Sequence, residues 1–273
     1  MITVAIPTAN RGGFLRRTLP SILSQTGVTF DVVVVDNGSN DETATVVSGY
    51  RDSRLRYIRT EGLDVVACWN EAASQARHPF LSLFHDDDLM EPGFLAESCR
   101  ALRQHPTAGF SFCRASCVDE LANHLGPWYD GEVPQGLITG FDYVRLSVLA
   151  GRCLTIAPTV VFRTEMLPNS GPFGSPHSGN TFDFNLYLKI ASTHDVAFID
   201  RPLVRYTIHA GQMTEKHWRS GRETGRVGAM AELIDAVAIL VRSDSARQDE
   251  FRQWVAGRLV DFNDRRSQNL KTL

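Results

Sequence analysis

Short apolar stretches and amphipathic stretches alternate through the first 115 residues of the chain. The apolar stretches are rich in β-branched and aromatic residues and are apolar on both faces, which is typical of parallel strands covered by helices on both sides. They lie at residues 2–8, 30–36, 55–60, 79–86 and 108–115. The pattern therefore predicts an α/β fold with a doubly wound parallel sheet.

Three of the intervening stretches carry apolar residues at helical spacing and are predicted to be crossover helices. They lie at residues 14–23, 65–73 and 94–102. One more helix is predicted after residue 36, because Ser39 and Glu42 have the spacing of a capping box.

Beyond residue 120 the pattern becomes less regular and is punctuated by Gly and Pro. Residues 171–180 (GPFGSPHSGN) are predicted to form a loop, which is a candidate lid. A helix is expected at residues 182–191, followed by a pair of strands within residues 195–209. Two amphipathic helices are expected in residues 216–273, and we expect them to pack on the body of the protein.

Composition narrows the class of protein. Hydrophobic residues make up 43% and charged residues 22% of the chain, as in ordinary globular proteins. The formal net charge of −3 is too mild for a general nucleic-acid binder, and no apolar run approaches the roughly 18 residues of a membrane-spanning helix. The N-terminus lacks the pattern of an export signal, so we expect a cytoplasmic location, with peripheral membrane contact left open. The five cysteines have no CxxC spacing and are expected to be free thiols.

Ligands of open parallel sheets bind beyond the carboxyl ends of the strands, so the residues that follow each strand are the informative ones. The first strand leads into PTANRGG, which is not the GxGxxG pattern of dinucleotide-binding proteins. Pro7, Thr8 and Arg11 offer a rigid turn, a hydroxyl and a cation there instead. Asp36 ends the second strand, where it could accept hydrogen bonds from a ribose or a pyrimidine or could form an Asx turn. The sequence leaves both roles open.

The fourth strand ends in His85, Asp86, Asp87 and Asp88. Adjacent carboxylates raise one another's pKa unless a cation or hydrogen-bond donors compensate. Hard oxygen ligands select Mg²⁺ or Mn²⁺, and such an ion commonly holds a diphosphate. The alternative for Asp88 is that it caps the helix that opens near Pro92.

Taken together, these segments resemble family 2 glycosyltransferases of the GT-A fold. Residues 5–23 and 32–43 are similar to the opening nucleotide-binding segments of that family, and residues 61–92 to the stretch that leads into its DxD metal motif. Residues 182–191 and 201–209 look like its acceptor-side helix and closing strand. The QxxRW signature of processive synthases is missing.

The resemblance implies roles for individual residues. It places the nucleoside near Pro7, Thr8, Arg11 and Asp36, with Asp64 and Asn70 bordering the nucleotide and Asp86 meeting the ribose. It implies Asp87 as the metal-binding carboxylate, with Asp88 and His209 as further candidates for metal contact, and Asp183 as the catalytic base. Asp183 could otherwise be a helix N-cap, and His209 a structural histidine.

Three residues depart from the family pattern. His85 replaces the first Asp of the common DxD motif, Phe182 replaces an acidic neighbour of the base, and Trp69 stands where an Arg is frequent.

The resemblance implies an inverting, non-processive, metal-dependent glycosyltransferase. Its donor would be a UDP-, dTDP- or GDP-linked sugar, its cofactor Mg²⁺ or Mn²⁺ and its acceptor an unidentified hydroxyl compound. The implied organisation is a catalytic domain over residues 1–215, made of a nucleotide-binding part (1–115) and an acceptor-side part (116–215), and a C-terminal helical extension over residues 216–273. The alternatives are a sugar-nucleotide pyrophosphorylase and a non-catalytic nucleotide-sugar-binding protein.

Overall fold

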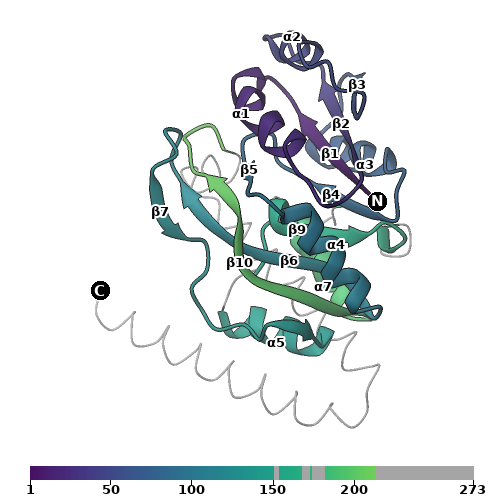
Figure 1. Ribbon diagram of the computed structural model, residues 1–273, viewed down its shortest axis with the longest axis vertical. Helices are drawn as coiled ribbons and strands as arrows, with labels where there is room; N and C mark the ends of the chain where they lie inside the picture. Colours follow the sequence, from purple (N-terminus) through teal and green to yellow (C-terminus); the bar gives the residue numbers. More distant parts are fainter. Residues whose placement is uncertain (151–153, 168–172, 174–181, 213–273) are drawn as a thin grey trace, which may run out of the picture.

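A computed structural model describes residues 1–150, 154–167, 173 and 182–212 (Figure 1). Its central feature is one mixed sheet with the strand order β3-β2-β1-β4-β9-β6-β10-β5, to which β7 and β8 add by pairing with β6 and β10. The strands are β1 (Ile2–Thr8), β2 (Phe30–Asn37), β3 (Leu55–Thr60), β4 (Phe80–Leu83), β5 (Leu89–Met90), β6 (Ala108–Val118), β7 (His124–Pro127), β8 (Gly136–Ile138), β9 (Val160–Arg163) and β10 (Asp195–Thr207). The helices are α1 (Gly12–Leu23), α2 (Thr43–Ser48), α3 (Val65–Ser74), α4 (Phe94–Gln104), α5 (Gly140–Ala150) and α7 (Phe182–Ala191), with a short 3₁₀ turn at Ala157–Thr159.

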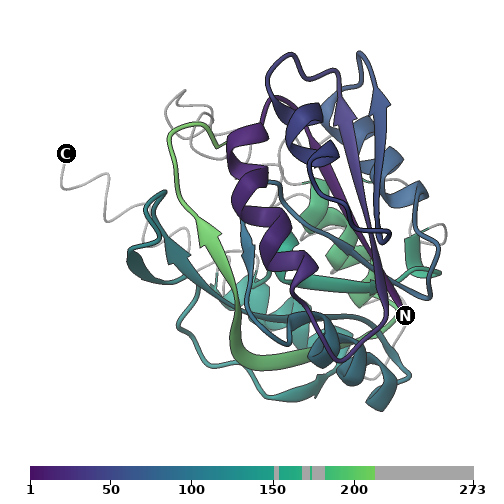
Figure 2. The ribbon, with the colours of Figure 1, turned by 45° about the horizontal axis from the view of Figure 1, so that its top comes forward.

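The first half of the sheet confirms the predicted parallel arrangement. β1 pairs in parallel with both β2 and β4, and β2 pairs in parallel with β3. Successive residues of β2 point to opposite faces: Val32 and Val34 join the hydrophobic cluster that includes residues of α1 and α4, and Val33 and Val35 join the cluster that includes residues of α3. Burial on both faces explains why this strand is a continuous apolar run. Figure 2 shows α1 lying along one face of these strands.

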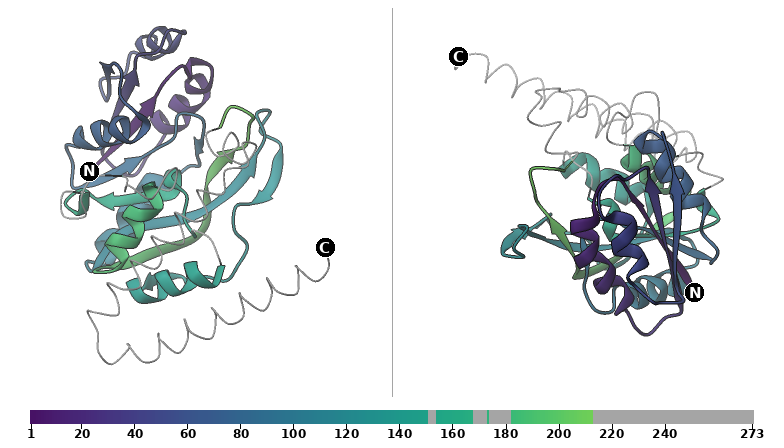
Figure 3. Two further views of the ribbon diagram at one scale, coloured as in Figure 1. Left: turned by 180° about the vertical axis from the view of Figure 1, so that it is seen from behind. Right: turned by 90° about the horizontal axis from the view of Figure 1, so that it is seen from above.

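The second half of the sheet differs from the prediction in two respects. β9, a four-residue strand that the sequence pattern did not reveal, lies between β4 and β6 and is antiparallel to both. The expected pair of strands at 195–209 is instead the single 13-residue strand β10. Its register against β6 shifts between Ile199 and Val204, around Pro202, so the chain bends without ending the strand. α5 and α7 pack against each other next to this half of the sheet (Figure 3).

The predicted capping box at Ser39 and Glu42 is wrong. α2 begins at Thr43, and Glu42 occupies the N-cap position without a capping hydrogen bond from its side chain. The Ser39 hydroxyl accepts a hydrogen bond from the backbone N–H of Asn10, 2.7 Å away. Ser39 is therefore engaged by the neighbouring β1–α1 loop, which the local spacing could not reveal.

Asp41 performs the capping task instead. Its Oδ1 accepts hydrogen bonds from the backbone N–H of Thr43 at 2.9 Å and from the Thr43 hydroxyl at 2.5 Å. Its Oδ2 accepts from the N–H of Gly12 at 3.0 Å, at the start of α1. One carboxylate thus holds the beginnings of two helices together and joins the β1–α1 and β2–α2 loops.

Two expectations lie outside the described residues: the candidate lid, apart from Phe173, and the helices of residues 216–273. The division of the chain at residue 215 therefore stays a prediction. In the described part of the chain, no helix is both long and apolar enough to cross a bilayer.

We predict that Asp41→Ala lowers the free energy of unfolding by about 1 kcal/mol, because it removes the cap of α2 and a bond to α1. Glu42→Ala is the matched control and should leave the stability nearly unchanged, because Glu42 makes no capping bond. Urea denaturation of the two variants measures the difference. A larger loss of stability for Glu42→Ala than for Asp41→Ala would show that Glu42 caps the helix, as the capping box predicts.

Candidate active site

The predicted site residues gather where β1, β2 and β4 end. Thr8 is the last residue of β1, Asp36 lies at the end of β2, and His85 to Asp88 follow β4. The Thr8 hydroxyl donates a hydrogen bond to Oδ2 of Asp86 at 2.6 Å, which joins the end of β1 to the acidic motif. The strand order therefore brings these positions to one edge of the sheet, as the sequence predicts.

The backbone of the acidic motif is held by a buried hydroxyl of α1. Oγ1 of Thr18 lies 2.9 Å from the carbonyl oxygen of Asp86 and 2.9 Å from that of Asp88. Thr18 itself is fully buried. The turn after β4 is thus anchored to the helix that follows β1.

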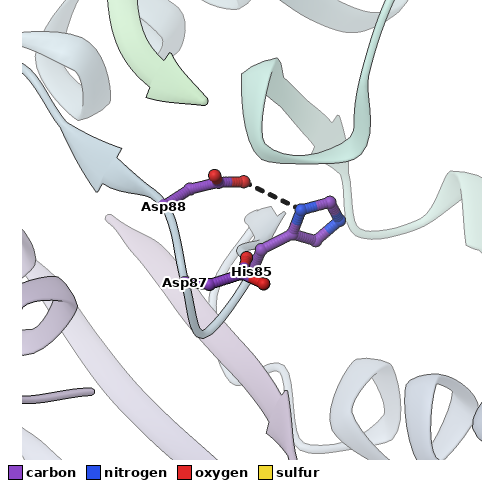
Figure 4. A group of neighbouring side chains, drawn as sticks. All are labelled: His85, Asp87 and Asp88. Atoms are coloured by element: carbon purple, nitrogen blue, oxygen red, sulfur yellow. Dashed lines mark hydrogen bonds and ion pairs between the residues drawn. The ribbon is translucent and has the colours of Figure 1, made fainter. Parts of the chain in front are cut away.

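Asp88 is fully buried and ties the motif to the last strand. Its Oδ1 accepts a hydrogen bond from the N–H of Thr207 at 2.7 Å, and its Oδ2 lies 2.8 Å from Nδ1 of His85 (Figure 4). The alternative role of Asp88 as a helix cap is wrong, because Gly93 occupies the N-cap position of α4.

Asp87 is held by a different residue of the same region. Its Oδ2 lies 2.9 Å from Nε2 of His209, which follows the end of β10. The His209 side chain is 2% exposed and that of Asp87 10% exposed, so water competes little for this contact.

His85, Asp87 and Asp88 form a cluster that could hold a metal ion. Each offers one possible ligand atom, and these atoms lie within 4.8 Å of one another (Figure 4). Carboxylate oxygens with an imidazole nitrogen suit Mn²⁺, and Mg²⁺ accepts the carboxylates. The donor set therefore fits the expected divalent cation. His85 was marked in the sequence only as a departure from the family pattern, and the structure adds it to the candidate ligands.

Burial and mutual repulsion control the ionisation of the three carboxyls. Burial, together with the charge of Asp87, raises the pKa of Asp86 to about 7. Burial likewise raises the pKa of Asp88 to about 6 against the opposing effect of His85. For Asp87 burial also acts upward, but the hydrogen bond from His209 and the charges of His85, His209 and Arg11 outweigh it, so the pKa lies below its usual value. Asp87 is therefore the carboxyl that is most readily ionised.

His85 has the opposite balance. Burial acts to lower its pKa, but the hydrogen bond to Asp88 and the charges of Asp88, Asp87 and Asp183 raise it to about 9. A positive charge is thus favoured at this position.

Asp36 is completely buried and surrounded by hydrogen-bond donors. Its Oδ1 accepts from the N–H of Ser39 at 2.9 Å, which is the Asx-type turn considered from the sequence. Its Oδ2 accepts from the hydroxyl of Tyr57 and lies 3.6 Å from a guanidinium nitrogen of Arg59. Tyr57 and Arg59 remain more than a third exposed. Asp36 therefore orients Tyr57 and Arg59, and the exposed side chains of these two residues are the ones that a ligand could contact.

Pro7 and Arg11 flank the end of β1. Pro7 is buried within the strand and pairs with Val35. Arg11 occupies the N-cap position of α1, and its Nη2 donates to the carbonyl oxygen of Gly211 at 2.9 Å. The guanidinium of Arg11 thereby links this loop to the segment that follows β10.

Asp64 and Asn70 have structural partners at α3. Asp64 is the N-cap of this helix and accepts from the N–H of Ala67 at 2.7 Å. The Asn70 side chain accepts from the backbone N–H of Phe173 at 2.9 Å and donates to its carbonyl oxygen at 3.4 Å. The structure therefore gives both side chains a structural partner, and their place at the border of the nucleotide stays a prediction.

Asp183 lies in the first turn of α7, across an aromatic side chain from the acidic motif. The ring of Trp69 is 5.6 Å from that of His85 and 5.1 Å from that of Phe182, centroid to centroid. Burial raises the pKa of Asp183, against the opposing hydrogen bonds and the charge of His85. A buried carboxyl with a raised pKa is suited to accept a proton. The sequence marked Trp69 only as a departure from the family pattern, and its position between His85 and Phe182 was not predicted.

Comparison with known proteins assigns the family. Residues 3–133 match the model of glycosyl transferase family 2. Residues 3–133 therefore belong to that family. The matched residues contain the first four strands of the parallel sheet and the acidic motif.

Several known proteins and solved structures are similar to the chain. It is 37% identical over 100 residues to validoxylamine A glucosyltransferase of Streptomyces hygroscopicus subsp. jinggangensis, which covers 35% of this chain and 24% of that protein. The structure of S. aureus TarS in complex with UDP-GlcNAc superposes with a TM-score of 0.63 at 20% identity, covering 88% of this chain and 70% of that one. The mannosyltransferase PcManGT from Pyrobaculum calidifontis, in complex with GDP-Man and Mn²⁺, gives a TM-score of 0.56 at 19% identity over 95% and 79% of the two chains.

These likenesses confirm the GT-A type of α/β fold that the sequence resemblance implied. The chain spans from about a quarter to two thirds of the length of the curated relatives that it matches.

We predict that Mn²⁺ stabilises the protein more at about pH 8 than at about pH 5.5. The folded-state pKa values of Asp86 and Asp88 are raised to about 7 and about 6. The stability that these two carboxyl groups contribute is therefore full below the unfolded pKa of 3.8 and is lost as the pH rises through 6 to 7. A divalent cation compensates the carboxylates that form. Thermal melts with and without Mn²⁺ at both pH values measure this, and equal shifts would contradict it.

Proposed function

We propose that this chain is an inverting, non-processive glycosyltransferase that transfers one sugar from a nucleoside-diphosphate donor to an acceptor hydroxyl. The observation that carries the proposal is the convergence of Thr8, the Asp86–Asp88 carboxylates and Asp183 around one edge of the sheet in a family 2 fold. The bound UDP-GlcNAc and GDP-Man of the two solved structures support a UDP-, dTDP- or GDP-linked sugar as donor.

The nucleotide is proposed to lie over the ends of β1, β2 and β4. Thr8 and Asp86 form a hydrogen-bonded pair at the centre of this surface, where Asp86 would meet the ribose. Asp36 would act on the base through Tyr57 and Arg59, because its own carboxylate has no exposed surface. Arg11 supplies a positive charge next to Asp86 and Asp87. Pro7, Asp64 and Asn70 would shape the borders of the surface.

Mg²⁺ or Mn²⁺ is the proposed cofactor. Asp87 would hold it, with His85 and Asp88 as the neighbouring candidate ligands. When bound, the ion would neutralise the charge that develops on the departing diphosphate. The Mn²⁺ of the Pyrobaculum calidifontis structure supports this assignment.

Asp183 is the proposed general base. The acceptor oxygen attacks the anomeric carbon from the face opposite the diphosphate, and its proton passes to the Asp183 carboxylate as the bond to the diphosphate oxygen breaks. The configuration at the anomeric carbon is then inverted. The raised pKa of Asp183 strengthens the carboxylate as a base relative to an exposed Asp.

Asp183→Asn tests the proposed reaction. The amide preserves the shape of the side chain but cannot accept the proton, so turnover should fall by about 10²- to 10⁴-fold while nucleotide affinity stays nearly constant. In the wild type the rate should rise with pH through the raised pKa of Asp183. NMR of the anomeric proton should show a β-linked product from an α-linked donor. Retention of configuration, or an active Asp183→Asn protein, would refute the mechanism.

Asp87→Asn tests the proposed cofactor. Removing this charged oxygen should abolish metal-dependent transfer and leave the thermal unfolding temperature close to that of the wild type, because the amide can still accept the hydrogen bond from His209. The exposed Asp130→Asn is the matched control and should retain full activity. Full activity of Asp87→Asn, or of the wild type in EDTA, would overturn the metal requirement.

A further inference from the structure

Trp69, on α3, contacts aromatic rings from three separate segments of the chain. Its ring meets that of His85, in the turn after β4, with centroids 5.6 Å apart and planes at 68°. It meets the ring of Phe173 at 5.8 Å and 69°, and that of Phe182, the first residue of α7, at 5.1 Å and 80°. Edge-to-face contacts of this kind are favourable and directional. At Trp69, therefore, α3, the turn after β4 and the start of α7 meet.

Phe173 and Phe182 also contact each other, with ring centroids 6.4 Å apart, so that Trp69, Phe173 and Phe182 form a ring triad. All three side chains are buried. The neighbouring Asn70 adds a polar link, because its side chain accepts from the N–H of Phe173 at 2.9 Å and donates to its carbonyl oxygen at 3.4 Å. Two adjacent residues of α3 thus hold Phe173 by its ring and by its backbone.

The two helices joined by the ring triad rest on different parts of the sheet. α3 packs against β1, β2 and β4, whereas α7 packs against β6 and α5. β9 lies between β4 and β6 in the strand order. The side-chain contacts between Trp69 and Phe182 therefore help to set the distance between α3 and the start of α7.

Asp183 follows Phe182 directly and is partly exposed, between the buried rings of Phe182 and Phe184. Its carboxyl group receives hydrogen bonds from the N–H of Phe184 and from the side chain of Tyr187. Both partners belong to α7, so they orient the carboxyl group within the helix and move with it. The position of the carboxyl group relative to the acidic motif requires a contact from outside α7, and Trp69 provides one.

We propose that Trp69 is a positioning residue, which fixes Asp183 relative to the acidic motif through the ring triad and does not touch the reacting atoms. This inference rests on the proposed function, in which Asp183 accepts the proton of the acceptor. A displacement of about 1 Å in a catalytic group can lower a rate about 100-fold, so a contact that fixes this distance matters for turnover.

Two substitutions of Trp69 test the role of its ring. Trp69→Leu keeps an apolar side chain without a ring, and Trp69→Phe keeps a ring. The probe reaction is the release of UDP from UDP-GlcNAc, or of GDP from GDP-mannose, with Mn²⁺ present and water as the acceptor. We expect Trp69→Leu to lower kcat about 10- to 100-fold. KM for the donor should stay within about twofold of the wild type, and Trp69→Phe should restore most of kcat.

Phe112→Leu is the matched control for the loss of a buried ring. Phe112 belongs to the same hydrophobic cluster as Trp69, and its ring contacts are with Phe110, Tyr143 and Phe198. It should therefore keep nearly the full kcat. An equal loss of kcat in Phe112→Leu and Trp69→Leu would overturn the proposal, as would a Trp69→Leu protein that raises KM and leaves kcat unchanged.

A double-mutant cycle with Asp183→Asn shows whether Trp69 acts through the base. In the Asp183→Asn protein, Trp69→Leu should cause no further loss of kcat, because the carboxylate that it positions is already gone. Losses that multiply would show that Trp69 acts independently of Asp183, which overturns this inference and leaves the proposed base in place. An active Asp183→Asn protein would instead refute the proposed function, and this inference with it.

Hydrogen exchange measures the positioning without any turnover. The backbone amides of residues 182–186, at the start of α7, should exchange about 10-fold faster in Trp69→Leu than in the wild type. In Trp69→Phe and in the control Phe112→Leu they should exchange at nearly the wild-type rate. Unchanged exchange at the start of α7 in Trp69→Leu would contradict the positioning role.

Discussion

The placement of three consecutive, largely desolvated carboxyl groups just after β4 is the constraint on which this structure depends. Removing carboxylates from water is costly unless donors or cations meet them. The structure meets each one separately: Thr8 bonds to Asp86, His209 contacts Asp87, and Thr207 and His85 bond to Asp88. Because these partners come from β1, the turn after β4 and the end of β10, the motif connects the two halves of the sheet.

The same arrangement divides the carboxyls into different tasks. Asp88 has no exposure, and its two oxygens contact β10 and His85, so this candidate ligand also fixes the position of the motif. Asp87 has a lowered pKa, which favours its ionised form, and Asp86 accepts a hydrogen bond from the Thr8 hydroxyl. The three adjacent Asp residues thus have different surroundings, because each contacts a residue that lies about 80 to 120 positions away along the chain.

The first half of the fold could be predicted from the sequence because its central strands are buried on both faces. Such strands appear in the sequence as continuous apolar runs, of which Val32–Val35 is one. β9 could not, since four residues carry too little pattern, and neither could the continuity of β10, since a Pro within a strand reads as a break. In the site, the positions of Thr8, Asp36 and the acidic motif followed from the rule about strand ends. The bonds of Ser39 and the contact of Trp69 with His85 depend on distant partners, which local spacing does not encode.

The return of residues 207–212 to the acidic motif has a consequence for biosynthesis. During translation the first 115 residues leave the ribosome well before Thr207 and His209 exist, so Asp87 and Asp88 lack these donors. In such a nascent chain the carboxyl groups of Asp87 and Asp88 must be hydrated or protonated instead. Residues 1–115 alone therefore cannot form the complete set of contacts around Asp87 and Asp88, because two of the partners lie at and just after the end of the last strand.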